Sequence, residues 1–142
     1  MTHMHVAGEI HAEVTSPAPV WLTRPEDVNA LTTKLWSRTA HRGDDGVIEV
    51  GGVRLTDLAE QVGTPAYVLD EEDFRARARA WKQAFDGWTV YYAGKAFLSG
   101  TIARWVSEEG LSLDVCSLGE LTVALRAGFD PARIGHHGNN KS

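Results

Sequence analysis

The feature that most constrains the fold is an alternation of strand-like and helix-like segments that begins near residue 65. Apolar runs at 66–69, 89–93 and 111–115 recur about every 22 residues, each is followed by a helical pattern, and residues 131–137 lead into a fourth apolar stretch. This alternation predicts βα units with a parallel sheet, because parallel neighbours need a crossover connection, usually a helix. In such sheets the chemically active side chains lie at the carboxyl ends of the strands.

Local signals indicate where the helices begin. Asp70 is the expected N-cap of the first helix, and the acidic turn at 71–73 suits the positive end of its dipole. One face of this helix is apolar and contains Phe74, Ala78, Trp81 and Phe85. A second helix is expected over about 101–109. Ser117 followed by Glu120 is a capping box and predicts the start of a third helix.

The chain is expected to divide into three parts. Residues 1–20 show no sustained helical or strand period and are expected to form a flexible tail. Residues 21–64 form an N-terminal segment in this interpretation, with a short helix over about 25–36. Residues 65–142 contain the βα series.

A β-hairpin is expected within the N-terminal segment. Residues 47–50 and 53–55 are short apolar strands, and the glycines at 51 and 52 suit a two-residue primed turn. Thr56 is expected to cap a short helix over 57–62, which Gly63 ends. So small a hairpin is not stable alone, so it must pair with another element.

Charge and cysteine content exclude several classes of function. Lys and Arg number 14 against 19 Asp and Glu, and the net charge of −5 excludes a strongly basic nucleic-acid binder. The single cysteine, Cys116, excludes an internal disulfide framework and a thiolate zinc cluster, and the tail histidines His3 and His5 are expected to be solvated. No apolar run approaches the ~20 residues that span a bilayer, and no signal peptide is evident. We expect a cytoplasmic protein that binds neither metal, nucleic acid nor membrane.

Lys95 is the first candidate for chemistry. It directly follows the expected strand at 89–93 and has small neighbours. A partly desolvated lysine at a strand's carboxyl end can form a Schiff base with a carbonyl compound. On position alone, a lysine that extends into solvent is the favoured interpretation, and only the surrounding residues reverse this preference.

The residues around Lys95 resemble a known family. Residues 92–97 read Tyr-Ala-Gly-Lys-Ala-Phe, which resembles the pyridoxal-phosphate attachment string of the group IV decarboxylases. Residues 113–121 (Leu-Asp-Val-Cys-Ser-Leu-Gly-Glu-Leu) are similar to that family's second barrel strand and the helix after it, and residues 63–70 to its entry strand. Residues 137–141 (His-Gly-Asn-Asn-Lys) resemble the branch that acts on diaminopimelate.

The resemblance implies a fold and an activity. It implies the N-terminal part of a pyridoxal-phosphate-binding (β/α)8 barrel of the TIM type. It also implies that the hairpin belongs to a C-terminal β-domain that this chain does not contain. The implied reaction is the decarboxylation of meso-2,6-diaminopimelate to L-lysine by a homodimer with shared active sites. As an N-terminal fragment without the family's phosphate-binding Gly-rich loop, the chain is expected to be inactive alone.

The resemblance also suggests site residues. It implies that Lys95 holds the cofactor and is catalytic. Asp114 is a candidate cofactor-binding residue, with a purely structural role as the alternative. His137 is a second candidate, but an indirect or structural role is favoured for it, because the histidine that stacks on the cofactor ring in this family lies later in the chain. Cys116 is expected to be a buried small residue rather than a nucleophile.

Other functions remain open at this point. Ornithine, arginine and carboxynorspermidine decarboxylases share the implied fold, and only residues 137–141 favour diaminopimelate over their substrates. Alanine racemases are disfavoured because residues 96–101 lack the tyrosine that follows their lysine. A non-catalytic cofactor-binding protein is disfavoured because its lysine string usually reads Ser-Lys-Thr. A truncated, non-catalytic form is the remaining alternative.

Overall fold

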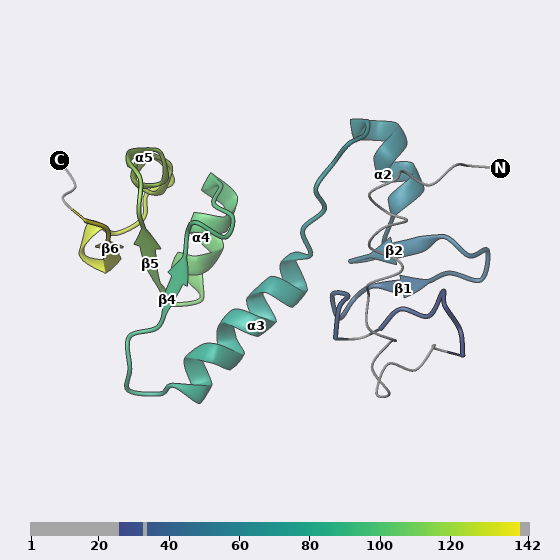
Figure 1. Cartoon of the computed structure of the whole chain (residues 1–142), viewed down its shortest axis with the longest axis horizontal. Coiled ribbons are helices and arrows are strands. Elements are labelled where there is room, and N and C mark those ends of the chain that lie inside the picture. The colour runs from purple at the N-terminus through teal and green to yellow at the C-terminus, as the bar shows by residue number, and fades with distance from the viewer. Residues whose placement is uncertain (1–25, 33, 140–142) are drawn as a thin grey trace, which may run out of the picture. The chain divides into compact units, whose positions relative to one another are not determined.

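The computed structural model describes residues 26–32 and 34–139 (Figure 1). The chain divides into two units, Met1–Ala30 and Leu31–Ser142. Of the first unit only residues 26–30 are described, and they form a turn in which Ala30 N donates to Asp27 O at 3.3 Å. The flexible tail expected over 1–20 therefore lies outside the described residues.

A small antiparallel sheet precedes the βα series. Its strands are β1 (His41–Arg42), β2 (Ile48–Val50) and β3 (Val53–Arg54), in the order β1-β2-β3. Gly51 and Gly52 join β2 to β3 with φ angles of 59° and 75°, a left-handed turn that favours glycine. The expected hairpin is confirmed, and β1 is the element with which it pairs.

Three expectations for the N-terminal segment and its exit are wrong. Residues 26–32 and 34–36, which belong to the expected helix over 25–36, contain no helix. Helix α2 (Leu55–Val62) begins one residue before Thr56, and its N-cap Arg54 makes no side-chain cap hydrogen bond. Residues 66–69 pair with no described strand and are exposed, so their apolar character does not reflect a strand.

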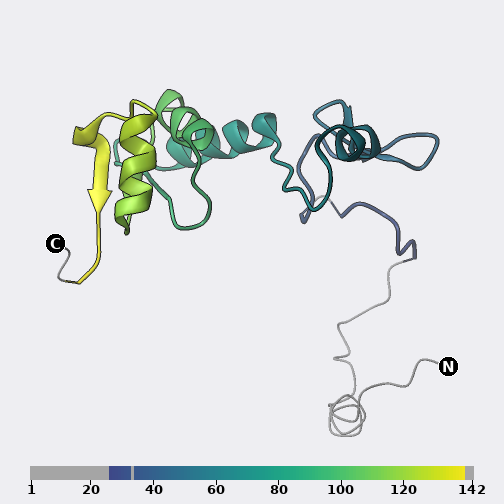
Figure 2. The same cartoon turned by 90° about the horizontal axis from the view of Figure 1, so that it is seen from above.

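The βα series forms a parallel sheet in the order β4-β5-β6. Its strands are β4 (Tyr91–Ala93), β5 (Ser112–Val115) and β6 (Ile134–His136). Helix α3 (Glu71–Ala84) precedes β4, α4 (Gly100–Glu108) joins β4 to β5, and α5 (Leu118–Arg126) with the short 3₁₀ helix η1 (Pro131–Arg133) joins β5 to β6. Figure 2 shows α5 beside the yellow strand β6. The parallel βα architecture predicted from the alternation is confirmed.

The capping signals in the βα series are also confirmed. Asp70 caps α3 by accepting a hydrogen bond from Asp73 N at 3.0 Å, and Ser117 caps α5 by accepting one from Glu120 N at 3.2 Å. Ser99, which the sequence pattern did not single out, caps α4 in the same way. Each side chain satisfies a backbone N–H that the helix itself leaves without a partner.

The two faces of the parallel sheet differ in chemistry. Leu113 and Val115 of β5 are fully buried and pack with Ile102 and Val106 of α4 and Ala124 of α5. Alternation along each strand places the neighbouring residues on the opposite face. That face contains Tyr91, Ala93, Ser112, Asp114 and Gly135, as the pairing of Ala93 with Asp114 and of Asp114 with Gly135 requires.

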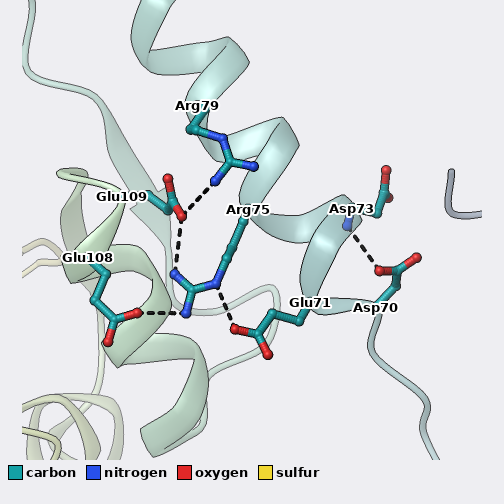
Figure 3. A network of polar contacts seen from close by, with 7 residues as sticks. All are labelled: Asp70, Glu71, Asp73, Arg75, Arg79, Glu108 and Glu109. Carbon is teal, nitrogen blue, oxygen red and sulfur yellow. Dashed lines mark hydrogen bonds and ion pairs between the residues drawn. The ribbon is translucent and has the colours of Figure 1, made fainter. Parts of the chain in front are cut away.

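Arg75 links α3 to the end of α4 (Figure 3). Its guanidinium contacts Glu71 at 2.7 Å, Glu108 at 2.6 Å and Glu109 at 3.1 Å, and it also lies 5.5 Å from the Trp105 ring. The hydrogen bonds that Arg75 donates to these carboxylates, most of all to Glu108, raise the pKa of Arg75 above its ordinary value. This network holds α3 against the C-terminal end of α4.

No helix within the described residues is long and apolar enough to cross a membrane.

Candidate active site

The three predicted site residues lie at the carboxyl ends of three adjacent parallel strands. Lys95 is exposed and lies two residues after β4. Asp114 is half-buried in β5, and His137 directly follows β6. The sheet therefore brings to one edge residues that the sequence predicted separately, as expected for an α/β active site.

The turn that presents Lys95 is held by its neighbours. Ala96 N donates to Ala93 O at 3.1 Å, and the Tyr92 hydroxyl donates to Phe97 O at 2.7 Å. Burial raises the pKa of Tyr92, so its hydroxyl stays protonated and can donate at neutral pH. Lys95 itself forms no hydrogen bond or ion pair with another described residue, so its amine is available to a ligand.

Gly94 brings the lysine turn close to β5. Gly94 N donates to Asp114 O at 2.8 Å, which extends the ladder between β4 and β5 by one bond. A Cβ at residue 94 would lie 2.9 Å from that same backbone oxygen, closer than a Cβ is normally found. The residue before Lys95 is therefore restricted to glycine by the distance between two backbones.

Asp114 and His137 form a close pair across β5 and β6. His137 Nδ1 lies 2.6 Å from Asp114 Oδ1, and the two side chains are 55% and 26% exposed. The backbone supports the pair, because His137 N donates to Val115 O at 3.0 Å. A carboxylate beside an imidazole orients the ring and selects which nitrogen holds the hydrogen.

Gly135 leaves space for this pair on the face of the sheet. A Cβ at residue 135 would lie 3.2 Å from Tyr91 Cε1 and 3.7 Å from Asp114 Oδ1. The Tyr91 ring and the Asp114 carboxylate thus occupy the space beside β6 that a larger residue would need. A glycine inside a strand pattern often marks such a close approach, and this was the available signal in the sequence.

Cys116 takes part in the turn between β5 and α5. Glu120 accepts hydrogen bonds from Cys116 N at 2.7 Å and from Cys116 Sγ at 3.6 Å. The hydrogen bond from Cys116 N is the main cause of the lowered pKa of Glu120. The expected capping box is therefore modified, because the Glu120 carboxylate reaches the residue before the N-cap rather than the N-cap itself.

Three contributors to this edge were not predicted as part of it. Tyr92 holds the lysine turn, Gly94 allows the close approach of β4 to β5, and Gly135 leaves room beside Asp114. Gly94 and Gly135 act through contacts to residues that are distant along the chain, whereas Tyr92 contacts Phe97, five residues away. Among the described residues, no group of three or more His, Cys, Asp or Glu side chains is arranged to hold a metal ion.

Comparison with known proteins agrees with the predicted architecture. Residues 71–142 match the family model for the pyridoxal-dependent decarboxylases, pyridoxal binding domain. The chain is 51% identical to the diaminopimelate decarboxylase of Mycobacterium leprae over 99% of its own length and 30% of that protein. It is 56% identical to the diaminopimelate decarboxylase of Corynebacterium efficiens over 82% of its length and 26% of that protein.

Solved structures show the same relationship. The diaminopimelate decarboxylase of M. jannaschii matches with a TM-score of 0.62 and 29% identity, over 75% of this chain and 26% of that one. The protein AQ1208 of Aquifex aeolicus matches with a TM-score of 0.63 and 33% identity, over 73% of this chain and 26% of that one. The expectation that the chain forms the opening βα units of a larger α/β barrel protein is confirmed.

The chain spans less than a third of the length of these relatives. The family model nevertheless covers the whole segment from the start of α3 onward, including the edge that holds Lys95, Asp114 and His137. The chain belongs to the family of pyridoxal-dependent decarboxylases, and its residues 71–142 belong to that family's pyridoxal-binding domain.

Proposed function

We propose that the full-length protein is a diaminopimelate decarboxylase, which removes one carboxyl group from meso-2,6-diaminopimelate to give L-lysine. The single observation on which this depends is the exposed amine of Lys95 at the carboxyl edge of β4, in a chain about half identical to named diaminopimelate decarboxylases. A solved relative from M. jannaschii in complex with L-lysine supports the proposed product.

The residues at this edge fit pyridoxal phosphate. Lys95 offers a primary amine that is not engaged by other described residues, which is what the carbonyl carbon of the cofactor requires. Asp114 and His137 offer a charged acceptor and an orientable ring one and two strands along. When bound, the cofactor supplies a conjugated ring that takes up the electron pair released as carbon dioxide leaves.

We propose distinct tasks for the chain's own residues. Lys95 binds the cofactor covalently through Nζ, yields it to the substrate amine and binds it again after the product forms. Asp114 and His137 form a pair on one side of the sheet, beside the turn that holds Lys95, and this pair would form part of the cofactor site. Tyr92 and Gly94 fix the turn from which Lys95 extends, so that its amine is presented from a rigid position.

The test is reductive trapping in the full-length protein. Borohydride reduction of the cofactor-loaded protein should add a pyridoxyl group to the peptide that contains Lys95. Lys95→Arg should abolish both the label and carbon dioxide release, whereas Lys34→Arg, a change at an exposed loop lysine, should leave both intact. A label on any other peptide would contradict the proposal.

The substrate is tested in a separate experiment. Carbon dioxide release should occur with meso-diaminopimelate and should be at least about a hundredfold slower with ornithine or arginine, because a second ammonium-carboxylate end is missing from both. If ornithine or arginine reacts faster than meso-diaminopimelate, the protein is still a pyridoxal-dependent decarboxylase, but meso-diaminopimelate is not its substrate.

We also propose a cytoplasmic homodimer with shared active sites. This proposal rests on the family resemblance of the sequence motifs. Light scattering on the full-length protein measures the dimer directly, and a mass equal to one chain would contradict it.

A further inference from the structure

Asp114 connects all three strand ends of the candidate active site. Its backbone oxygen accepts the hydrogen bond from Gly94 N at 2.8 Å, directly before Lys95. Its side chain contacts His137 on the other side at 2.6 Å. One residue therefore sets the position of both the lysine turn and the imidazole.

The Asp114 contact gives the two nitrogens of His137 different roles. An ionised carboxylate only accepts hydrogen bonds, so the hydrogen of the neutral ring lies on Nδ1. Nε2 is then the acceptor of the same ring. Because His137 is 55% exposed, its ring is accessible to a ligand at this edge.

His136 provides an internal comparison. It directly precedes His137 and is also exposed. It pairs in register with Val115, so it lies on the same face of the sheet as Val115, opposite to the face that contains Asp114. His137 instead shares its side of the sheet with Asp114, which pairs with Gly135. The two histidines are adjacent in the sequence, but the Asp114 carboxylate orients only the ring of His137.

We propose that Asp114 is the positioning residue for His137, and that His137 presents Nε2 as a hydrogen-bond acceptor to a protonated group of the cofactor held by Lys95. This inference rests on the proposed function. It assigns Asp114 an indirect role through the ring, and His137 a direct contact through one defined nitrogen.

Two substitutions separate the nitrogens of the ring. In His137→Asn the side-chain amide nitrogen takes the approximate place of Nδ1, so the contact with Asp114 is kept and the Nε2 acceptor is lost. His137→Asn should therefore weaken pyridoxal phosphate binding about tenfold, the effect of losing one hydrogen bond in a polar site, while the urea midpoint stays unchanged. Asp114→Asn should weaken binding by a similar factor.

The double variant tests whether Asp114 acts through His137. If it does, Asp114→Asn/His137→Asn binds the cofactor no more weakly than either single variant. The measurement is titration of the full-length apoprotein with pyridoxal phosphate, followed by visible absorption. His136→Gln and Asp130→Asn are the matched controls, and both should bind within about twofold of the wild type.

The possible outcomes separate the inference from the proposed function. If the double variant loses pyridoxal phosphate affinity by the product of the two single-variant losses, Asp114 does not act through His137. With the borohydride label still on Lys95, this result overturns the positioning role and leaves the proposed function intact. If Asp114→Asn and His137→Asn bind the cofactor as the wild type does but unfold at a lower urea concentration, the pair is only a structural contact. This result also overturns the positioning role. A borohydride label away from Lys95 overturns the proposed function and the inference together.

Discussion

Gly94→Ala tests how closely the lysine turn must approach β5. The added Cβ would lie 2.9 Å from Asp114 O, 3.4 Å from Leu98 Cδ2 and 3.7 Å from Leu113 Cδ1. The Leu98 side chain can rotate away, but Asp114 O belongs to the backbone and accepts the bond from Gly94 N. The methyl group must therefore push β4 and β5 apart at the residue before Lys95.

The magnitude follows from three contributions. Overpacking costs about 1–3 kcal/mol, and weakening the Gly94 N–H hydrogen bond costs up to about 1 kcal/mol. Alanine returns about 0.4–1 kcal/mol by restricting the unfolded chain. The expected net loss of unfolding free energy is about 1–3 kcal/mol, and the displaced turn should also lower the yield of borohydride trapping at Lys95.

Gly100→Ala is the matched control for this change. Gly100 is the first residue of α4, and a Cβ there meets only Arg104 Nη1, at 3.6 Å, an ordinary contact. Alanine should be neutral or stabilising by up to about 1 kcal/mol at this helical position. The measurements are the unfolding free energy of both variants in urea and their yield of borohydride trapping at Lys95. If Gly94→Ala matches Gly100→Ala in both measurements, the close approach of the two backbones does not limit residue 94.

Three further predictions concern stability. Leu113→Ala removes a side chain that is 0% exposed and should lower the unfolding free energy by about 2–5 kcal/mol, whereas Leu118→Ala, at 77% exposed, should change it by less than about 0.5 kcal/mol in the same urea titration. Arg75→Gln should destabilise the protein in low salt, and this difference should shrink in about 1 M NaCl because salt screens the pairs with Glu71 and Glu108; equal differences in both salts would refute an ionic origin. Burial raises the pKa of Asp70, but hydrogen bonds from Thr39 and Asp73 N outweigh it and the pKa is lowered. The stability from ionised Asp70 is therefore fully present above the ordinary Asp pKa of about 3.9 and is lost as the pH falls through the lowered native value. The stability difference between wild type and Asp70→Asn should accordingly fall between about pH 5 and pH 2, and a difference independent of pH would contradict the assigned role.

Features that depend on neighbouring residues were predictable from the sequence. The caps Asp70 and Ser117 and the Gly51-Gly52 turn are satisfied by atoms a few residues away, so the local pattern identifies them. The parallel βα order was predictable for a related reason, since the periodicity of each segment determines its type and the crossovers determine the pairing. The position of Lys95 at a strand end follows directly from that order.

Local patterns failed where a distant partner determines the structure. Residues 66–69 are apolar yet exposed and pair with no strand in the described part of the chain, since an apolar run forms a strand only beside a partner. Strand β1 is the reverse case, because His41 and Arg42 show no strand pattern and are ordered by pairing with Glu49 and Ile48. Pairing across the sheet, not propensity, decides both.

The sequence by itself determined the βα order, the helix caps Asp70 and Ser117, and the placement of Lys95, Asp114 and His137 at strand ends. Only the tertiary structure showed that Asp114 contacts His137, 23 residues away, and that Gly94 and Gly135 are needed for close approaches to β5 and to Tyr91. The physical reason is the range of the forces involved. Periodicity and capping act over a few residues, whereas a contact of 2.6 Å between two strand ends depends on the register of the whole sheet.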